Sequence, residues 1–219
     1  MCIRDRFETA RDIGERLMAK YPDVAMHQHK LAQALNNMSS LHKELGVWDV
    51  AWKELETARD LLTPLTISHP DVAAYKRDLA TIHGNLGTRL KDLGKLTEAK
   101  NAFETARELA KDLSQVYADE PKYLYEFTKN QMNLGIVLRD LGQWEAARRE
   151  LETAREQQKQ LCAKHPDVSR YQLGLAKVRN NLGVLLQNLG ERKLARNELE
   201  GARDQIKALA ANHAGVSTY

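Results

Sequence analysis

The chain has 219 residues, of which 42% are hydrophobic, and its 33 Lys and Arg exceed its 30 Asp and Glu to give a net charge of +3. This small basic excess, with both signs interspersed, does not fit a nucleic-acid binder. Cys2 and Cys162 are too few for a disulfide framework or a zinc site, and no apolar run of about 18 residues could cross a membrane. Composition predicts a soluble, mostly helical, cytoplasmic protein without nucleic-acid or membrane partners.

An internal repeat with a step of 48 residues runs through the chain. Its most regular element reads Phe-Glu-Thr-Ala-Arg or a close variant, and its five copies begin at Phe7, Leu55, Phe103, Leu151 and Leu199. An asparagine keeps the same step at Asn37, Asn85, Asn133 and Asn181. Such self-similarity is typical of a repeat architecture, in which each unit stacks on the next to bury its apolar face.

In chain order, we interpret 1–6 as a non-repeat leader or an artefact, and the repeat array as a single domain over 7–219. A partial second helix is predicted at 7–20, followed by units that begin near residues 23, 71, 119 and 167. The fourth unit stops at Tyr219, in register with the start of a further unit, so we interpret the chain as a segment of a longer array.

Each unit is predicted to form two antiparallel helices of about 22 residues, or roughly 33 Å. In the second unit, apolar residues from Tyr75 to Leu93 recur every three or four positions, which is a helical pattern. Gly94 is then suited to end the first helix, and a second stripe runs from Leu96 to Leu113. Pro64 lies inside a predicted second helix, so we expect the helix to bend or end between Asp60 and Pro64.

The pattern resembles the tetratricopeptide repeat. The residues of the second unit at the family's signature offsets are Leu86, Gly87, Leu90, Gly94, Ala99, Phe103 and Ala106. The step exceeds the roughly 34 residues of the common form, and this long form resembles arrays of bacterial multidomain signalling proteins and of kinesin light chain. The resemblance implies an all-α, right-handed superhelical solenoid of antiparallel helix pairs that serves as a protein-interaction scaffold.

The resemblance also implies that first helices line a concave groove for an extended peptide. Carried over by register, the groove residues are Gln33, Asn36, Asn37, Ser40 and Lys43, then Thr81, Gly84, Asn85, Thr88 and Lys91, then Lys129, Met132, Asn133, Ile136 and Arg139, then Lys177, Asn180, Asn181, Val184 and Gln187. The recurring asparagine has two interpretations. Its amide can pair with the backbone of a bound peptide, because it is both donor and acceptor. It can equally form a structural ladder between successive helices, and the sequence leaves open binding, ladder or both.

Basic residues form two rows on the predicted groove. One row is Lys43, Lys91 and Arg139, and the other is Lys129 and Lys177. These rows favour a ligand with carboxylates or a free C-terminus, through charge-assisted hydrogen bonds. An acid adjoins each member of the first row, at Glu44, Asp92 and Asp140. A solvated face whose charges neutralise one another is therefore the alternative.

Other recurring residues receive structural interpretations. Trp48 and Trp144 share one repeat position, and we expect both to pack in the core. The arginine of each five-residue element is followed by an acid, as in Arg107 and Glu108, which predicts a ribbon of alternating charge along the array. Cys162 takes the place of small residues in other units and is interpreted as a packing residue.

No arrangement of residues predicts catalysis, a metal site or a cofactor. His69, His165 and His213 belong to different repeats, no Gly-rich phosphate-binding motif occurs, and no His partner for Cys162 is evident. We therefore expect a non-enzymatic scaffold that presents its groove to a peptide or protein partner. The alternative is a structural spacer or self-association module of a larger multidomain signalling protein, whose ends dock on neighbouring copies.

Overall fold

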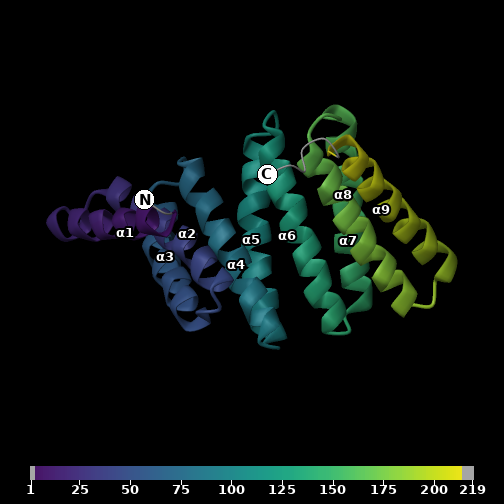
Figure 1. Ribbon diagram of the computed structural model, residues 1–219, viewed down its shortest axis with the longest axis horizontal. Helices are drawn as coiled ribbons and strands as arrows, with labels where there is room; N and C mark the ends of the chain where they lie inside the picture. Colours follow the sequence, from purple (N-terminus) through teal and green to yellow (C-terminus); the bar gives the residue numbers. More distant parts are fainter. Residues whose placement is uncertain (1–2, 214–219) are drawn as a thin grey trace. The chain divides into compact units, whose positions relative to one another are not determined.

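The computed structural model describes residues 3–213, with side chains placed for 6–211. Within this range the chain forms nine α-helices and no strand (Figure 1). The chain divides into two compact units, Met1–Lys95 and Leu96–Tyr219, which are described separately. None of the described helices combines the length and the apolar character needed to cross a bilayer.

The first unit contains four helices. They are α1 (Ile3–Lys20), α2 (Ala25–Glu44), α3 (Trp48–Ser68) and α4 (Ala73–Asp92). Each packs on the next, and α4 also contacts α2, so that the first helices of successive repeats are neighbours. Helix α1 begins at Ile3, inside the segment that we interpret as a leader.

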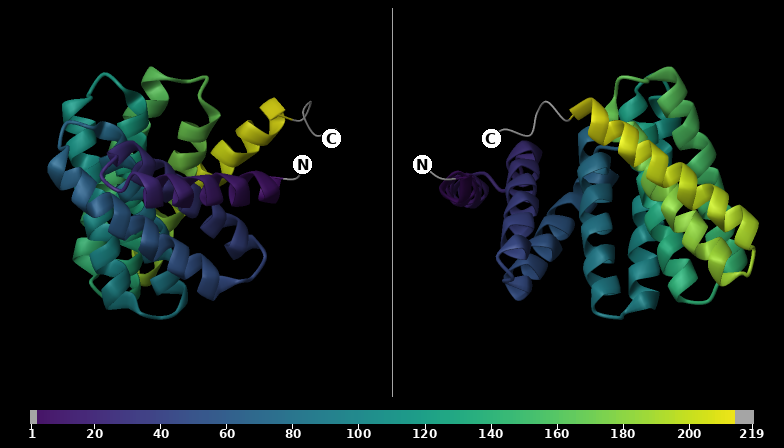
Figure 2. Two further views of the ribbon diagram at one scale, coloured as in Figure 1. Left: turned by 90° about the vertical axis from the view of Figure 1, so that its left-hand side faces the viewer. Right: turned by 45° about the vertical axis from the view of Figure 1, so that its right-hand side comes forward.

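The second unit contains five helices. They are α5 (Leu96–Val116), α6 (Pro121–Asp140), α7 (Trp144–Lys164), α8 (Ser169–Asn188) and α9 (Arg192–His213). Successive helices run antiparallel and pack side by side, and α8 also contacts α6 (Figure 2). The predicted all-α helical-repeat solenoid is therefore confirmed.

Glycine terminates the first helices as expected. Gly142 has φ +73° after α6, and its amide donates to Arg139 O at 2.9 Å. The next amide, of Gln143, donates to Leu138 O at 2.8 Å. This paired arrangement satisfies carbonyls at the helix end and requires a left-handed residue, which glycine adopts without steric cost.

Glycines in the middle of the first helices allow the two helices of a hairpin to approach closely. A Cβ at Gly135 on α6 would lie 2.7 Å from Leu151 Cγ on α7, and a Cβ at Gly183 on α8 would lie 2.7 Å from Leu199 Cγ on α9. Leu151 is fully buried. The mid-helix glycines thus have the packing role that offsets their low helix propensity.

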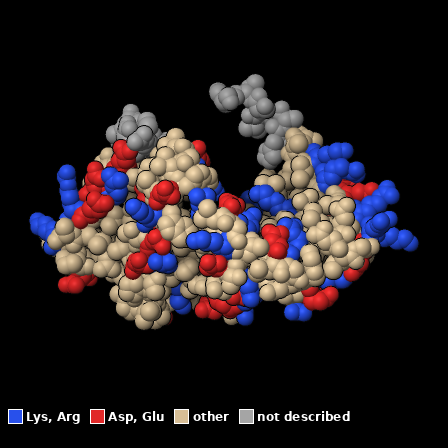
Figure 3. Space-filling view, turned by 90° about the horizontal axis from the view of Figure 1, so that it is seen from below, with Lys and Arg blue, Asp and Glu red and all other residues tan. Residues whose placement is uncertain are grey.

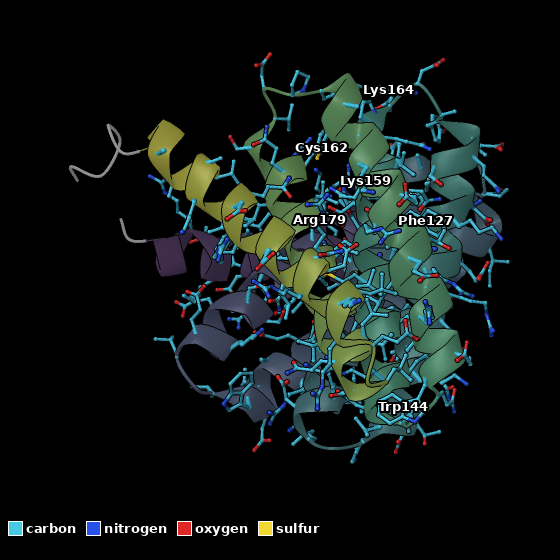
Figure 4. All side chains as sticks on the ribbon, turned by 90° about the vertical axis from the view of Figure 1, so that its right-hand side faces the viewer. Phe127, Trp144, Lys159, Cys162, Lys164 and Arg179 are labelled. Carbon is cyan, nitrogen blue, oxygen red and sulfur yellow. The ribbon has the colours of Figure 1, made fainter. Side chains whose placement is uncertain are left out.

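Two structural expectations need correction. Helix α3 runs through Pro64 to Ser68, so the helix does not end at the proline. Leu62 and Leu65 are buried on either side, and this packing offsets the lost backbone hydrogen bond. The core assignment of Trp144 is wrong, because 40% of this residue is exposed near the α6–α7 turn (Figure 4). Trp48 is only half-buried.

Candidate functional site

The polar faces of α2 and α4 enclose an open cavity of about 300 Å³ in the first unit. Four of the predicted groove residues line it, namely Gln33, Asn36, Asn37 and Thr81. Asp78 supplies the charged part of the wall. This cavity is called the α2–α4 cavity below.

The asparagines of α2 and α4 differ in their hydrogen bonds and exposure. Asn85 Nδ2 on α4 donates to Asn36 Oδ1 on α2 at 2.9 Å. This bond ties two successive first helices together, as a structural ladder would. Asn37 is exposed and lines the α2–α4 cavity, where its amide faces solvent. One member of the asparagine row therefore has a structural bond, while another is available to a ligand.

A partly buried cluster of polar and charged side chains in the wall of this cavity was not predicted from the sequence. His29 Nε2 and Gln33 Nε2 each lie 2.7 Å from Asp78 Oδ2, and Arg77 Nε donates to Asp78 Oδ1 at 2.9 Å. Burial acts to raise the pKa of Asp78, but hydrogen bonds from His29, Gln33 and Arg77 outweigh it and hold the pKa below its usual value. The cluster joins α2 to α4.

A second, small cavity of about 60 Å³ lies among α2, α3 and α4. Its apolar lining includes Trp48, Trp52 and Leu55, and its polar lining includes the predicted residues Lys43 and Asn85. Arg89 covers the face of Trp48, with its guanidinium carbon 4.5 Å from the ring centroid. This contact accounts for the partial burial of Trp48.

The second unit brings four predicted groove residues together, one of which is Met132. Lys129 and Asn133 on α6 and Lys177 on α8 line one cavity of about 200 Å³, called the lysine cavity below. Its remaining lining is Tyr125, Thr128, Met132, Gln158, Gly174 and Val178. Two cations thus meet a wall that also carries an amide, a phenol and apolar side chains.

Gln158 on α7 is only 1% exposed and links α6, α7 and α8 in the wall of the lysine cavity. Gln158 Oε1 on α7 accepts from Thr128 Oγ1 on α6 at 2.5 Å, and its Nε2 donates to Tyr171 O on α8 at 3.0 Å. A Cβ at Gly174 would lie 2.5 Å from Gln158 Nε2, so a larger residue there would displace the Gln158 amide. Sequence analysis did not single out Gln158 or Gly174, because each departs from its repeat equivalents.

The lysine cavity combines two ammonium groups, one of them paired with a carboxylate, and a phenol. Lys129 pairs with Glu126 at its edge, and Lys177 is exposed. Burial raises the pKa of Tyr125, so its phenol stays protonated at neutral pH and can donate. A carboxylate in the cavity would therefore meet ammonium, amide and hydroxyl donors at once.

Three further predicted residues, Asn181, Arg139 and Lys91, do not line any of the three cavities described above. Asn181 Nδ2 donates to Lys177 O at 2.9 Å within α8. Arg139 forms an ion pair with Asp140 at 2.8 Å. This contact agrees with the alternative interpretation, in which the basic row is neutralised by the acids beside it. Lys91 is half-buried on α4.

An ion-pair ladder links second helices in the second unit. Arg107 Nη1 on α5 donates to Glu150 on α7, and Arg155 Nη1 on α7 donates to Glu198 on α9. The same arginines pair with the acids that follow them, Glu108 and Glu156. Within the second unit, these arginines and acids alternate along the second helices as predicted, and each arginine makes an additional bond to the next repeat.

Side chains that could bind a metal ion or act as a nucleophile are scattered over the described part of the chain. No three His, Cys, Asp or Glu side chains are grouped there so as to hold a metal ion. Burial raises the pKa of the Cys162 thiol, opposed by the charge of Arg179 on α8. A protonated thiol is a poor nucleophile.

The stacked hairpins and the polar first-helix faces define a protein of the helical-repeat solenoid class. Residues 80–113 and 131–167 each match a family model described as tetratricopeptide repeat, so the chain contains tetratricopeptide repeats in these two segments. The longer 48-residue form of the family stays a prediction.

Several solved structures are similar to this chain. BtubC (BKLC) from P. vanneervenii is 16% identical, with a TM-score of 0.52 over 95% of this chain and 93% of that chain. TTC0263, a thermophilic TPR protein in Thermus thermophilus, is 18% identical, with a TM-score of 0.45 over 96% and 90%. MamA 41-end from Desulfovibrio magneticus RS-1 is 13% identical, with a TM-score of 0.49 over 93% and 97%. No curated protein sequence matches the chain.

Proposed function

We propose that this chain is a non-catalytic protein-interaction scaffold whose first helices bind an extended, acidic peptide segment of a partner protein. The lysine cavity carries the proposal. Lys129, Asn133 and Lys177, which sequence register assigns to the groove, line a single open cavity with an apolar component.

The chemistry of the cavity specifies the peptide. The two lysines would each donate to an Asp or Glu side chain or to a terminal carboxylate, because charge-assisted hydrogen bonds are roughly twice as strong as neutral ones. The Asn133 amide offers a donor and an acceptor to a peptide group. Met132 and Val178 would contact aliphatic parts of the peptide, and Met adapts to varied shapes.

The rigid wall of the cavity favours binding as well. Gln158 holds α6 and α8 at a fixed separation through its bonds to Thr128 and the Tyr171 carbonyl. A peptide would enter a site that is already formed, so that less conformational entropy is lost on binding.

A peptide-library selection on the full chain tests the proposal. Acidic peptides should be enriched, and Lys129→Gln or Lys177→Gln should weaken their binding by about tenfold or more, which corresponds to the loss of one charge-assisted bond. Lys164→Gln, at the end of α7 (Figure 4), removes the same charge from a residue that does not line the cavity, and it should leave affinity unchanged. Equal affinity for the cavity variants and this control would reject the lysine cavity as the site.

A further inference from the structure

The α2–α4 cavity and the lysine cavity occupy the same place in the repeat. Every residue that lines the α2–α4 cavity has a counterpart two repeat steps later that lines the lysine cavity. Asn37 corresponds to Asn133, for example. Ile82 corresponds to Val178, and both are buried. Each unit therefore has a cavity of this kind between two successive first helices.

The two cavities differ in the charges of their walls. Gln33 stands at the repeat position of Lys129. Thr81 likewise stands at the repeat position of Lys177. Of the described residues that line the α2–α4 cavity, Asp78 alone is charged. The α2–α4 cavity thus lacks, in its described wall, the two cations that line its counterpart.

The carboxylate of Asp78 is already paired. Its Oδ2 atom lies 2.7 Å from both His29 Nε2 and Gln33 Nε2. Its Oδ1 atom accepts from Arg77 Nε at 2.9 Å and lies 2.8 Å from Arg77 Nη2. A carboxylate has about four acceptor positions, and these contacts occupy them. A cationic ligand would therefore find no free acceptor on Asp78, and an anionic ligand would find no cation among the described lining residues.

The amides of the wall offer donors and acceptors together. Asn37 is exposed, and its side chain makes no hydrogen bond to another described residue. Asn36 accepts through Oδ1 from Asn85, so its nitrogen stays a donor. Gln33 Oε1 accepts one bond, from Lys30 Nζ at 3.3 Å, so that a second lone pair is free.

The wider surface does not add a charge preference on the face drawn in Figure 3. Basic and acidic side chains are interspersed over much of this face. Steering of a ligand by the field of a protein requires a surface or cleft dominated by one sign of charge. Selectivity therefore depends on the side chains that line each cavity.

We propose that the α2–α4 cavity is a second peptide-binding site and that it selects the uncharged amide side chain of an Asn or Gln in a partner segment. A carboxamide donates through its nitrogen and accepts through its oxygen, so it can pair with Gln33 and with Asn36 or Asn37 at once. A carboxylate offers acceptors alone and an ammonium offers donors alone. Either ion would also enter without a counter-ion, and burial of an unpaired charge is costly. This site goes beyond the acidic-peptide site proposed for the lysine cavity.

The α2–α4 cavity is held in shape without a ligand. The bond from Asn85 to Asn36 connects α4 to α2 at 2.9 Å, and Asp78 on α4 contacts His29 and Gln33 on α2. The two polar walls are therefore fixed at one separation. A peptide that enters such a site loses less conformational entropy than one that must order its site.

The test uses the isotopically labelled full chain and three capped pentapeptides of sequence Ala-Ala-X-Ala-Ala, in which X is Gln, Glu or Lys. Nuclear magnetic resonance titrations would follow the backbone amides of Asn37 and Thr81. At these residues the Gln peptide should bind at least about fivefold more tightly than either charged peptide, which corresponds to about one net hydrogen bond.

Two variants with matched controls locate the preference. Asn37→Ala should weaken binding of the Gln peptide about fivefold. Asn101→Ala, at an exposed residue of α5 that lines none of the three cavities, should leave it unchanged. Thr81→Lys places an ammonium at the repeat position of Lys177, and the preference should shift to the Glu peptide. Thr105→Lys adds the same charge at an exposed residue of α5 and should preserve the preference for Gln.

Each result decides the proposal. Equal binding of the three peptides, no shifts at Asn37 and Thr81, or an unchanged affinity in the Asn37→Ala chain would overturn it. An unchanged preference in the Thr81→Lys chain would do so as well, and if circular dichroism shows that this variant does not fold, the Asn37→Ala chain decides. The same spectra report on the lysine cavity through Asn133. A Glu peptide without effect there would count against the proposed function and leave the α2–α4 site standing.

Discussion

Arg155 on α7 and Glu198 on α9 are joined across 43 residues of sequence, with Nη1 2.6 Å from Oε1. Arg107 and Glu150 make the equivalent bond between α5 and α7. One residue pair, repeated at the repeat step, thus connects successive second helices.

This pair should contribute a modest coupling free energy. Both side chains retain some exposure, so the double-mutant cycle of Arg155→Ala and Glu198→Ala should give about 0.5–1 kcal/mol in urea unfolding. The coupling should fall with added salt. A cycle on Arg203 and Asp204, which are adjacent and more exposed, should give a smaller value; equal couplings would contradict a special role for the bond between repeats.

Gly135→Ala should destabilise the second unit despite the higher helix propensity of alanine. The new Cβ would lie 2.7 Å from Leu151 Cγ, and overpacking of this kind costs about 1–3 kcal/mol. Chemical denaturation measures the loss. Combining the change with Leu151→Ala should give less than the sum of the two losses, because the smaller side chain removes the clash; strict additivity would contradict the contact.

Substituting Asn85 and Asn133 one at a time should distinguish a structural role of the asparagine row from a role in peptide binding. Asn85→Ala breaks the bond to Asn36 and should lower the free energy of unfolding by about 1 kcal/mol. Asn133→Ala should leave stability within about 0.5 kcal/mol and weaken acidic-peptide binding. The reverse outcome, with binding dependent on Asn85 and stability on Asn133, would contradict the assignment.

Asp78 should make the first unit sensitive to acid. Its folded-state pKa lies below the unfolded value of about 3.9, so its stabilisation is fully present above that value and is lost as the pH falls through the folded pKa. Asp78→Asn should destabilise the chain at pH 7, and the difference from the wild type should shrink below about pH 4. Urea unfolding at several pH values tests this, and a constant difference would exclude the linkage.

The repeat in the sequence was sufficient to predict the fold. The copies of the five-residue element and the glycines such as Gly142 recur in register, so one helix pair predicts the others. Trp144 was assigned wrongly because register alone does not show whether a neighbouring helix covers a residue. The α6–α7 turn leaves its ring exposed.

The candidate site was only partly predictable. The family resemblance, carried over by register, placed Lys129, Asn133 and Lys177 on one groove, and in the structure they line one cavity. The shape of that cavity depends on Gln158 and Gly174, whose contact spans two helices and breaks the repeat pattern. The His29–Asp78 pair was missed for the same reason, because neither residue recurs at its equivalent positions.

Mapping by nuclear magnetic resonance would test the groove most directly. An acidic peptide selected by the full chain would be titrated into isotopically labelled protein, and the amide shifts would be followed by residue. The proposed function predicts shifts centred on Tyr125, Asn133, Gly174 and Lys177, and their loss in the Lys129→Gln/Lys177→Gln chain. Shifts confined to the second helices, or shifts that persist in that chain, would contradict peptide binding in the lysine cavity.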